Sequence, residues 1–279
     1  MAHQVTLITG ATSGMGKSTA LLLAGKGHRV FAGARRPEAG AALAQEAQAG
    51  GLTLEPVPLD VTDTASVEAA VRQVVERAGR LDNLVNNAGY GLVATVEQAT
   101  DEEMARQLDV NVLGVLRMCR AVLPTMRAQG SGVIVNVSSF LGRMGLPLLA
   151  HYNASKHAVE AITDSLRHEV RRFGIRVHSV MPGLFGTEFA KRGLVVNQAT
   201  MAEDSPYAEL VRRMVPMVAE KINNGPDPIA VAQAVERVLA DPEAPIRVPV
   251  GVEAETFVPM AKQMADEEFE RKVRETFGI

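Results

Sequence analysis

Short apolar runs alternate along this chain with longer segments in which apolar residues recur at helical spacing. The runs predict strands at residues 5–8, 30–32, 54–59, 84–85, 133–137 and 177–180, with a weaker run at 246–250. Helical patterns between them include 16–24, 64–78, 102–126 and 153–173. Continuously apolar strands are typical of a parallel sheet covered by helices on both faces. The pattern therefore predicts an α/β fold with a doubly wound parallel sheet of about seven strands, in a single domain over residues 1–279.

Residues 184–226 depart from this alternation of strands and helices. The segment is long, because a few residues usually suffice to connect a strand to the next helix. The segment is rich in side chains that suit an apolar pocket, since methionine adapts its shape and aromatic rings contribute large contact areas. These side chains are Phe185, Phe189, Met201, Tyr207, Met214 and Met217. We expect residues 184–226 to form a lid over the substrate, while ordinary core packing remains the alternative for each side chain taken singly.

Composition narrows the class of function. The formal net charge of −3 offers nothing to attract nucleic acid. No apolar run approaches the roughly 18 residues that span a bilayer, and the first strand begins too early to leave room for a signal sequence. The single cysteine, Cys119, lies in a helical pattern and is expected to be a buried thiol. We expect a cytoplasmic protein without a membrane or nucleic-acid partner and without a bound metal.

A glycine-rich turn follows the first strand and leads directly into a helical pattern. Its glycines fall at positions 10, 14 and 16. Glycine lets the backbone turn tightly and approach a phosphate, and the free amides at the start of the next helix attract a pyrophosphate. The turn predicts a dinucleotide site at Gly10, Thr12, Ser13, Gly14, Met15 and Gly16. The alternative is a loop that only connects strand to helix.

The end of the second predicted strand indicates which dinucleotide binds. Enzymes that choose NAD generally keep an acidic residue there for the ribose 2′-hydroxyl, whereas this chain has Ala34 followed by Arg35. A guanidinium pairs with a 2′-phosphate through charge-assisted hydrogen bonds that NAD cannot offer. The sequence favours NADP(H) over NAD(H), with a solvated surface arginine as the alternative.

Tyr152 and Lys156 open a predicted helix four positions apart, so both side chains lie on one face of it. Free tyrosine has a pKa near 10, which is high for proton transfer at neutral pH, and a neighbouring cation favours the phenolate. The spacing predicts that Lys156 lowers the pKa of Tyr152, which then acts as an acid and base. A tyrosine and a lysine that share a solvated helix by chance are the alternative.

Several motifs in order resemble the short-chain dehydrogenase/reductase family through about residue 187. They are the glycine turn, the run Asn86-Asn87-Ala88-Gly89, Asn111, Ser139, and the Tyr152 to Lys156 pair. Ser139 is chosen over its neighbour because family members place this serine 13 positions before the tyrosine. The resemblance implies a Rossmann-type fold and a catalytic set formed by Asn111, Ser139, Tyr152 and Lys156. The segment after Ser139 is most similar to hydroxysteroid and retinol dehydrogenase-like members.

The same resemblance implies further cofactor contacts. The Asp60 side chain, beside Val61, would bind the adenine amino group. The backbone of Asn87, Ala88 and Gly89 would lie along the cofactor. Lys156, next to Tyr152, would hold the nicotinamide ribose. A group after strand six would hold the nicotinamide carboxamide: Pro182, Gly183, Phe185 and Thr187. Asn111 would keep a water that links Lys156 to solvent.

These observations predict an NADP(H)-dependent oxidoreductase that interconverts a ketone or aldehyde and an alcohol on a mainly apolar small molecule. In reduction, Ser139 would bind the carbonyl oxygen and Tyr152 would protonate it. The alternative is a catalytically silent NADPH-binding sensor or regulatory protein, because a fold alone does not establish activity. The resemblance also implies a homodimer or homotetramer formed through the helices at 102–126 and 153–173.

Overall fold

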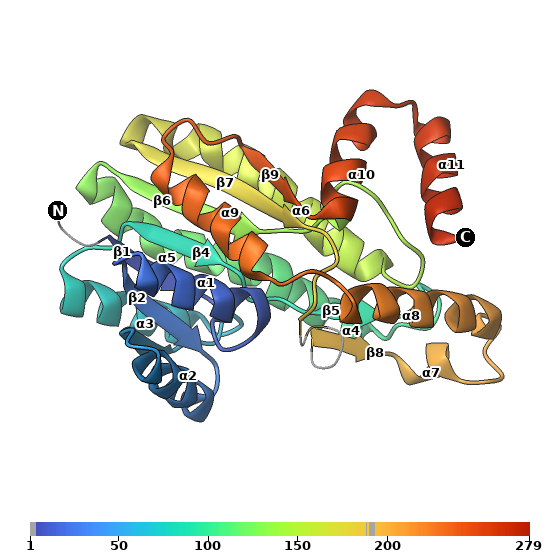
Figure 1. Cartoon of the computed structure of the whole chain (residues 1–279), viewed down its shortest axis with the longest axis horizontal. Helices are drawn as coiled ribbons and strands as arrows, with labels where there is room; N and C mark the ends of the chain where they lie inside the picture. Colours follow the sequence, from blue (N-terminus) through green and yellow to red (C-terminus); the bar gives the residue numbers. More distant parts are fainter. Residues whose placement is uncertain (1–3, 188, 190–192) are drawn as a thin grey trace.

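The computed structural model describes residues 4–187, 189 and 193–279, and a twisted parallel sheet runs through its centre (Figure 1). Within these residues the sheet has seven strands in the order β3-β2-β1-β4-β6-β7-β9. Their bounds are β1 (Val5–Ile8), β2 (Arg29–Ala34), β3 (Leu54–Pro58), β4 (Asn83–Asn86), β6 (Gly132–Val137), β7 (Ile175–Pro182) and β9 (Arg247–Val250). All neighbouring strands are parallel. The predicted doubly wound α/β fold in one domain is confirmed.

Helices cover both faces of the sheet, each over its own apolar cluster. One cluster packs the sheet against α3 (Thr64–Ala78), α5 (Gly114–Gln129) and α6 (Ala150–Val170). The other packs it against α1 (Gly14–Gly25), α2 (Pro37–Ala49) and α9 (Ile229–Ala240). Cys119 is buried in the first cluster, as predicted. The strand order reverses between β1 and β4, and an open α/β sheet binds ligands at such a point, beyond the carboxyl ends of its strands.

The helix predicted at 102–126 is divided. Helix α4 (Asp101–Leu108) begins with a capping box in which Thr100 and Glu103 bind each other's backbone amides. A π-helical turn, η1 (Asp109–Leu113), then separates α4 from α5. Asn111 lies in this turn and is 2% exposed. The extra residue in a π turn rotates the side chains that follow it, and such turns occur often at functional sites.

Residues 184–226 contain regular elements that the periodicity did not predict. They are β8 (Leu194–Val196), α7 (Gln198–Met201) and α8 (Ala208–Asn223). β8 pairs in parallel with β5 (Gly91–Val93), which follows β4. The two ends of the segment meet where the Gly186 amide donates to the Pro226 carbonyl at 2.9 Å. A Cβ on Gly225 would lie 2.8 Å from the Gly186 nitrogen, so the two backbones approach too closely for a larger residue.

Two further helices, α10 (Val252–Gln263) and α11 (Asp266–Phe277), follow β9 and stand together at one side of the molecule (Figure 1). They pack through Phe257 and Phe277 against the loop after β6, where the short 3₁₀ turn η2 (Phe140–Gly142) lies. In the described part of the chain, no helix is both long and apolar enough to cross a membrane.

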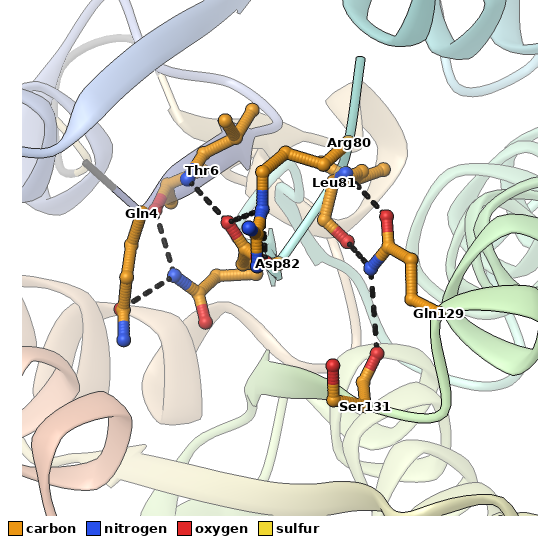
Figure 2. Close-up of polar contacts among 9 residues, drawn as sticks. Gln4, Thr6, Arg80, Leu81, Asp82, Gln129 and Ser131 are labelled. Atoms are coloured by element: carbon orange, nitrogen blue, oxygen red, sulfur yellow. Dashed lines mark hydrogen bonds and ion pairs between the residues drawn. The ribbon is translucent and has the colours of Figure 1, made fainter. Parts of the chain in front are cut away.

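A polar network holds the opposite end of the sheet, at the amino ends of β1 and β4 (Figure 2). The buried Asp82 carboxylate accepts the Val5 amide at 2.8 Å and a hydrogen bond from Arg80 at 2.6 Å. The Gln129 side chain accepts from the Leu81 amide at 2.9 Å and donates to its carbonyl at 3.0 Å. The Asp82 contact fixes where β4 starts relative to β1, and the Gln129 contacts join the end of α5 to the start of β4, far along the strands from their carboxyl ends.

Candidate active site

A cleft of about 750 Å³ opens at the carboxyl ends of the strands. Most residues predicted for the site line it: Gly10, Thr12, Ser13, Gly14, Met15, Arg35, Asp60, Val61, Asn87, Ala88, Gly89, Ser139, Tyr152, Lys156, Pro182, Gly183, Phe185 and Thr187. Two predicted residues, Gly16 and Asn111, are not in this lining. The sheet therefore brings residues from nearly the whole predicted set to one edge, although they are far apart in the sequence.

The glycine turn is held as a rigid cradle. Gly10 and Gly14 have φ angles of +62° and +50°, which other L-residues rarely adopt. The Asn87 side chain donates to the carbonyls of Thr9 and Gly10 at 3.0 and 3.1 Å. A Cβ on Gly16 would lie only 2.3 Å from the Asn87 Nδ2 atom. Gly16 is thus needed for the packing of α1 against the turn, which explains why it supports the cleft without lining it.

The cradle fits a pyrophosphate. Helix α1 starts at Gly14, and the Ser13 side chain makes no capping hydrogen bond to its first amides. Amides at a helix start carry partial positive charge and bind phosphate oxygens. Side chains at positions 10, 14 and 16 would fill the space beside the turn or strain it. The residues present therefore suit the dinucleotide that the fold implies.

The expected adenosine end of the cleft contains Asp60 and Arg35. The Thr62 amide and hydroxyl donate to the Asp60 Oδ1 atom at 2.9 and 2.7 Å. Burial raises the pKa of Asp60, but the Thr62 hydrogen bonds and the charges of Arg35 and Arg117 outweigh it and hold the pKa below its usual value. Asp60 is therefore an acceptor at neutral pH. Arg35 is exposed at the rim of the cleft.

Tyr152 and Lys156 lie together in the first turns of α6. The Lys156 Nζ atom is 5.6 Å from the centre of the Tyr152 ring and donates to the Val137 carbonyl at 2.9 Å. Burial lowers the pKa of Lys156 to about 8, with the negative charge of Glu160 acting against this shift. A large fraction of Lys156 therefore carries a proton at neutral pH.

The pKa of Tyr152 moves opposite to the direction expected from its spacing to Lys156. Burial raises the pKa of Tyr152 to about 12, and a hydrogen bond with Ser139 opposes the rise. The phenolate is disfavoured because the free-energy cost of removing its charge from water exceeds the stabilisation that the neighbouring groups provide. The adjacent Ser138 hydroxyl is buried without a hydrogen-bond partner among the described residues, so Ser139 is the serine paired with Tyr152.

Asn111 is connected to the site by hydrogen bonds to the Tyr90 backbone and to Ser155 of α6. Its Oδ1 atom accepts from the Tyr90 amide at 3.1 Å, and its Nδ2 atom donates to the Tyr90 carbonyl at 2.9 Å and to the Ser155 hydroxyl at 3.0 Å. Gln107 adds a second amide bridge, because it donates to the Tyr90 carbonyl at 2.8 Å and accepts from the Leu92 amide at 2.6 Å. Sequence reasoning missed Gln107, because a buried glutamine on an amphipathic helix has no distinctive pattern.

The loop after β7 closes the cleft opposite the glycine turn. The Gly183 amide donates to the Val250 carbonyl at 2.8 Å, and the Leu184 amide donates to the Glu253 side chain at 3.1 Å. A Cβ on Gly14 would lie 3.5 Å from the Cβ atom of Thr187, so the two segments face each other across a narrow gap. Glu253 was not predicted from the sequence, because it lies 69 residues beyond the loop that it holds.

The cleft continues past Tyr152 along an apolar wall formed by Val93, Leu148, Leu149, Leu194, Met214, Val215 and Val218. Of the side chains expected to line a lid, Phe185, Phe189 and Met214 do line the cleft. Met217 packs beside it, in the clusters around the C-terminal helices and α8. The other two turn away, since Met201 is 38% exposed and the Tyr207 hydroxyl donates to Glu97. In the described ranges, no group of three or more His, Cys, Asp or Glu residues could hold a metal ion.

Comparison with known proteins places this chain in the short-chain dehydrogenase/reductase family. The family model for short chain dehydrogenases matches residues 4–199. A crystal structure of a short-chain dehydrogenase from Streptomyces avermitilis has a TM-score of 0.83 at 33% identity, over 100% of this chain and 98% of that one. The protein is therefore an oxidoreductase of this family, which uses a nicotinamide cofactor.

Among the most similar curated relatives are two reductases. The chain is 38% identical over 251 residues to a 3-ketodihydrosphingosine reductase of Bacteroides thetaiotaomicron, which covers 90% of this chain and 89% of the relative. It is 39% identical over 189 residues to a 3-oxoacyl-[acyl-carrier-protein] reductase of Thermotoga maritima, over 68% of this chain and 77% of the relative. Neither is named as a hydroxysteroid or retinol dehydrogenase, so these relatives do not favour the branch predicted from the sequence.

Proposed function

We propose that this protein is an NADPH-dependent reductase that converts a ketone on an extended, mainly aliphatic molecule into an alcohol. The observation that carries the proposal is the convergence of Ser139, Tyr152 and Lys156 between a phosphate-binding cradle and an apolar wall in one cleft. A dinucleotide held in the cradle and a substrate held on the wall would meet at Tyr152.

The residues that would hold the cofactor follow the length of the cleft. The turn from Gly10 to Gly16 would bind the pyrophosphate, and Asp60 with Val61 would bind the adenine. The backbone from Asn87 to Gly89 would lie along the middle of the cofactor. At the other end, Pro182, Gly183, Phe185 and Thr187 would orient the nicotinamide carboxamide.

NADPH is preferred over NADH in this proposal because of the residues at the end of β2. Ala34 offers no carboxylate for a ribose 2′-hydroxyl, and the exposed Arg35 lies on the cleft beside it. A guanidinium binds a phosphate with two charge-assisted hydrogen bonds, and this favours binding of NADPH, which carries a 2′-phosphate.

When bound, the reduced nicotinamide supplies a hydride to the carbonyl carbon. The Ser139 hydroxyl donates a hydrogen bond to the carbonyl oxygen, on which negative charge develops. Because the pKa of Tyr152 is about 12, its phenol is protonated at neutral pH and can transfer its proton to that oxygen. The ammonium of Lys156 then stabilises the phenolate that remains. Asn111 holds the Tyr90 backbone beside α6.

The substrate class follows from the wall of the cleft. Valine, leucine and methionine side chains beyond Tyr152 provide no hydrogen-bonding group for a polar substrate. The relative from Bacteroides thetaiotaomicron is named a 3-ketodihydrosphingosine reductase, and dihydrosphingosine carries a long aliphatic chain. Both observations favour a flexible aliphatic ketone over a rigid steroid or a retinoid.

The test follows the absorbance of NADPH, and separately of NADH, at 340 nm with matched ketones: long aliphatic 3-keto compounds, steroids, retinoids and aryl ketones. We expect turnover with NADPH on the aliphatic ketones, and a loss of about 100-fold or more in Tyr152→Phe. Tight NADPH binding without turnover on any ketone would overturn the proposal in favour of an NADPH sensor. Equal turnover by Tyr152→Phe would overturn the assigned role of the tyrosine.

We propose a lid role for residues 184–226 and assembly into a homodimer or homotetramer. The lid is supported by the closure of its two ends at Gly186 and Gly225. The assembly is supported by Leu113 and Leu116, which are 45% and 43% exposed where η1 joins α5. Light scattering after gel filtration measures the assembly, and Leu116→Lys should shift it towards the monomer. A cytoplasmic location stays a prediction.

A further inference from the structure

A buried carboxylate, that of Glu160, lies one helical turn beyond Lys156 on the same face of α6. Glu160 is 3% exposed. Its Oε1 atom accepts a hydrogen bond from the Ser179 hydroxyl of β7, and its Oε2 atom accepts from the Arg247 Nε atom of β9 at 2.6 Å. The mechanism proposed above does not use this carboxylate, yet burying a charge is costly unless it is paired.

Glu160 also lies against the catalytic loop. A Cβ on Gly142, in the turn just after Ser139, would lie 3.1 Å from the Glu160 Cγ atom and 3.1 Å from the Lys156 carbonyl oxygen. One side chain therefore contacts α6, β7, β9 and the loop that carries Ser139. β9 is the edge strand beside β7, which brings a residue from near the end of the chain to this point (Figure 1).

Arg247 is shared between two carboxylates. Its Nε atom binds Glu160, and its Nη2 atom binds the Asp164 Oδ2 atom at 2.6 Å. The Arg247 side chain is 21% exposed and that of Asp164 is 50% exposed. A chain of ion pairs thus runs from Asp164 at the surface, through Arg247, to Glu160, which lies one helical turn from Lys156. A change at its outer end should alter how far Arg247 neutralises the buried carboxylate.

The groups around Lys156 leave Glu160 as its main charged neighbour in the described part of the chain. From β6, the Val137 carbonyl accepts from Nζ, and from the β4–β5 connection a Cβ on Gly89 would lie 3.9 Å from that atom. On α6 the Tyr152 phenol lies nearby and is protonated at neutral pH. Burial lowers the pKa of Lys156, and the negative charge of Glu160 is the influence that raises it.

We propose that Glu160 is a positioning residue that keeps Lys156 protonated for ketone reduction, and that Arg247 sets the strength of this effect. The inference rests on the proposed function, because it assigns the Lys156 ammonium a role in turnover. In this proposal, Arg247 connects the edge strand β9 to the active site through its charge as well as through packing.

Two variants should move the pH profile in opposite directions. Glu160→Gln keeps the shape of the side chain and removes its negative charge, so the pKa of Lys156 falls below about 8. As the pH rises, this variant should therefore lose activity at a lower pH than the wild type. Arg247→Met removes the cation that competes for Glu160, so the pKa of Lys156 rises and activity persists to higher pH. At the wild-type midpoint, a downward displacement of one unit lowers the rate about fivefold and an upward displacement of one unit raises it about twofold, whereas two units below the midpoint the rate is nearly unchanged.

The experiment measures kcat and kcat/KM with saturating NADPH from pH 5.5 to 10, together with a melting curve for each variant. Arg247→Lys keeps the charge and should restore the wild-type alkaline midpoint. Asp164→Asn changes only the exposed end and should fold normally. In this variant Arg247 pairs with Glu160 alone and neutralises its charge more fully. The alkaline midpoint should therefore move in the same direction as in Glu160→Gln, but by a smaller amount.

A structural role alone predicts a different result, in which kcat falls by the same factor at every pH. The inference is overturned if the folded variants keep the wild-type midpoint, and Asp164→Asn with Arg247→Met decide this even if Glu160→Gln does not fold. Failure of the proposed function is seen separately, as wild-type protein without Tyr152-dependent turnover.

Discussion

The contact between Gly16 and Asn87 makes a sharp test of how the cofactor cradle is held. In Gly16→Ala the new Cβ would lie 2.3 Å from the Asn87 Nδ2 atom and 2.4 Å from the Gly10 carbonyl oxygen. Overpacking of this kind costs about 1–3 kcal/mol. If the Asn87 side chain is displaced, its two hydrogen bonds to Thr9 and Gly10 are lost as well, at about 1 kcal/mol each.

Together these costs come to about 3–5 kcal/mol, and the higher helix propensity of alanine recovers about 1 kcal/mol, so we expect the free energy of unfolding to fall by about 2–4 kcal/mol in Gly16→Ala. For a chain of this length the melting temperature should drop by roughly 3–7 °C, because the entropy of unfolding is about 2.1 cal/mol/K per residue. NADPH binding should weaken at least tenfold, which corresponds to about 1.4 kcal/mol, because the displaced turn carries the phosphate-binding amides. Differential scanning calorimetry measures the first effect, and quenching of NADPH fluorescence on titration measures the second.

Gly25→Ala is the matched control, because it makes the same chemical change in the same helix. A Cβ there would meet only the Leu52 Cδ2 atom, at an ordinary contact distance of 3.7 Å. We expect it to leave NADPH binding unchanged and to stabilise the protein by about 0.5–1 kcal/mol, since alanine favours a helix over glycine. Equal melting temperatures and equal NADPH affinities in Gly16→Ala and Gly25→Ala would show that the contact between Gly16 and Asn87 does not hold the cradle.

Three other predictions address the cofactor, the base of the sheet and the thiol. Arg35→Leu should raise the KM for NADPH about tenfold while leaving that for NADH unchanged in steady-state assays, and parallel changes in both would contradict a 2′-phosphate contact. Asp82→Asn should lower the free energy of unfolding by about 1–3 kcal/mol, because it weakens the contacts to Arg80 and Val5, while kcat stays at the wild-type value. A large loss of kcat in a folded Asp82→Asn would show that this network reaches the active site. Burial raises the pKa of Cys119 to about 12, so iodoacetamide at pH 8 should label it only after unfolding; rapid labelling of native protein would refute its burial.

The strands and the dinucleotide turn were predictable because their signals are local. An apolar strand such as β6 is recognisable within a few residues, since both of its faces must be covered. The glycines at 10, 14 and 16 mark the turn, because few other residues tolerate its φ angles and close contacts. The spacing of Tyr152 and Lys156 likewise follows from the pitch of one helix.

Features that depend on distant partners were not predictable in this way. The π turn around Asn111 and the pairing of β5 with β8 depend on how separate elements pack, so the periodicity at 102–126 indicated one continuous helix. The bond between Glu160 and Arg247 joins residues 87 positions apart. No spacing rule connects residues at such a separation.

The pair of Tyr152 and Lys156 also combines a feature with a local cause and a feature that depends on distant residues. That Tyr152 and Lys156 share a helix face follows from the sequence, because that geometry is local. The opposite pKa shifts of the two groups, upward for Tyr152 and downward for Lys156, arise from their burial in the folded protein. Desolvation is the sum of everything packed around a group, and those neighbours come from strands and loops throughout the chain.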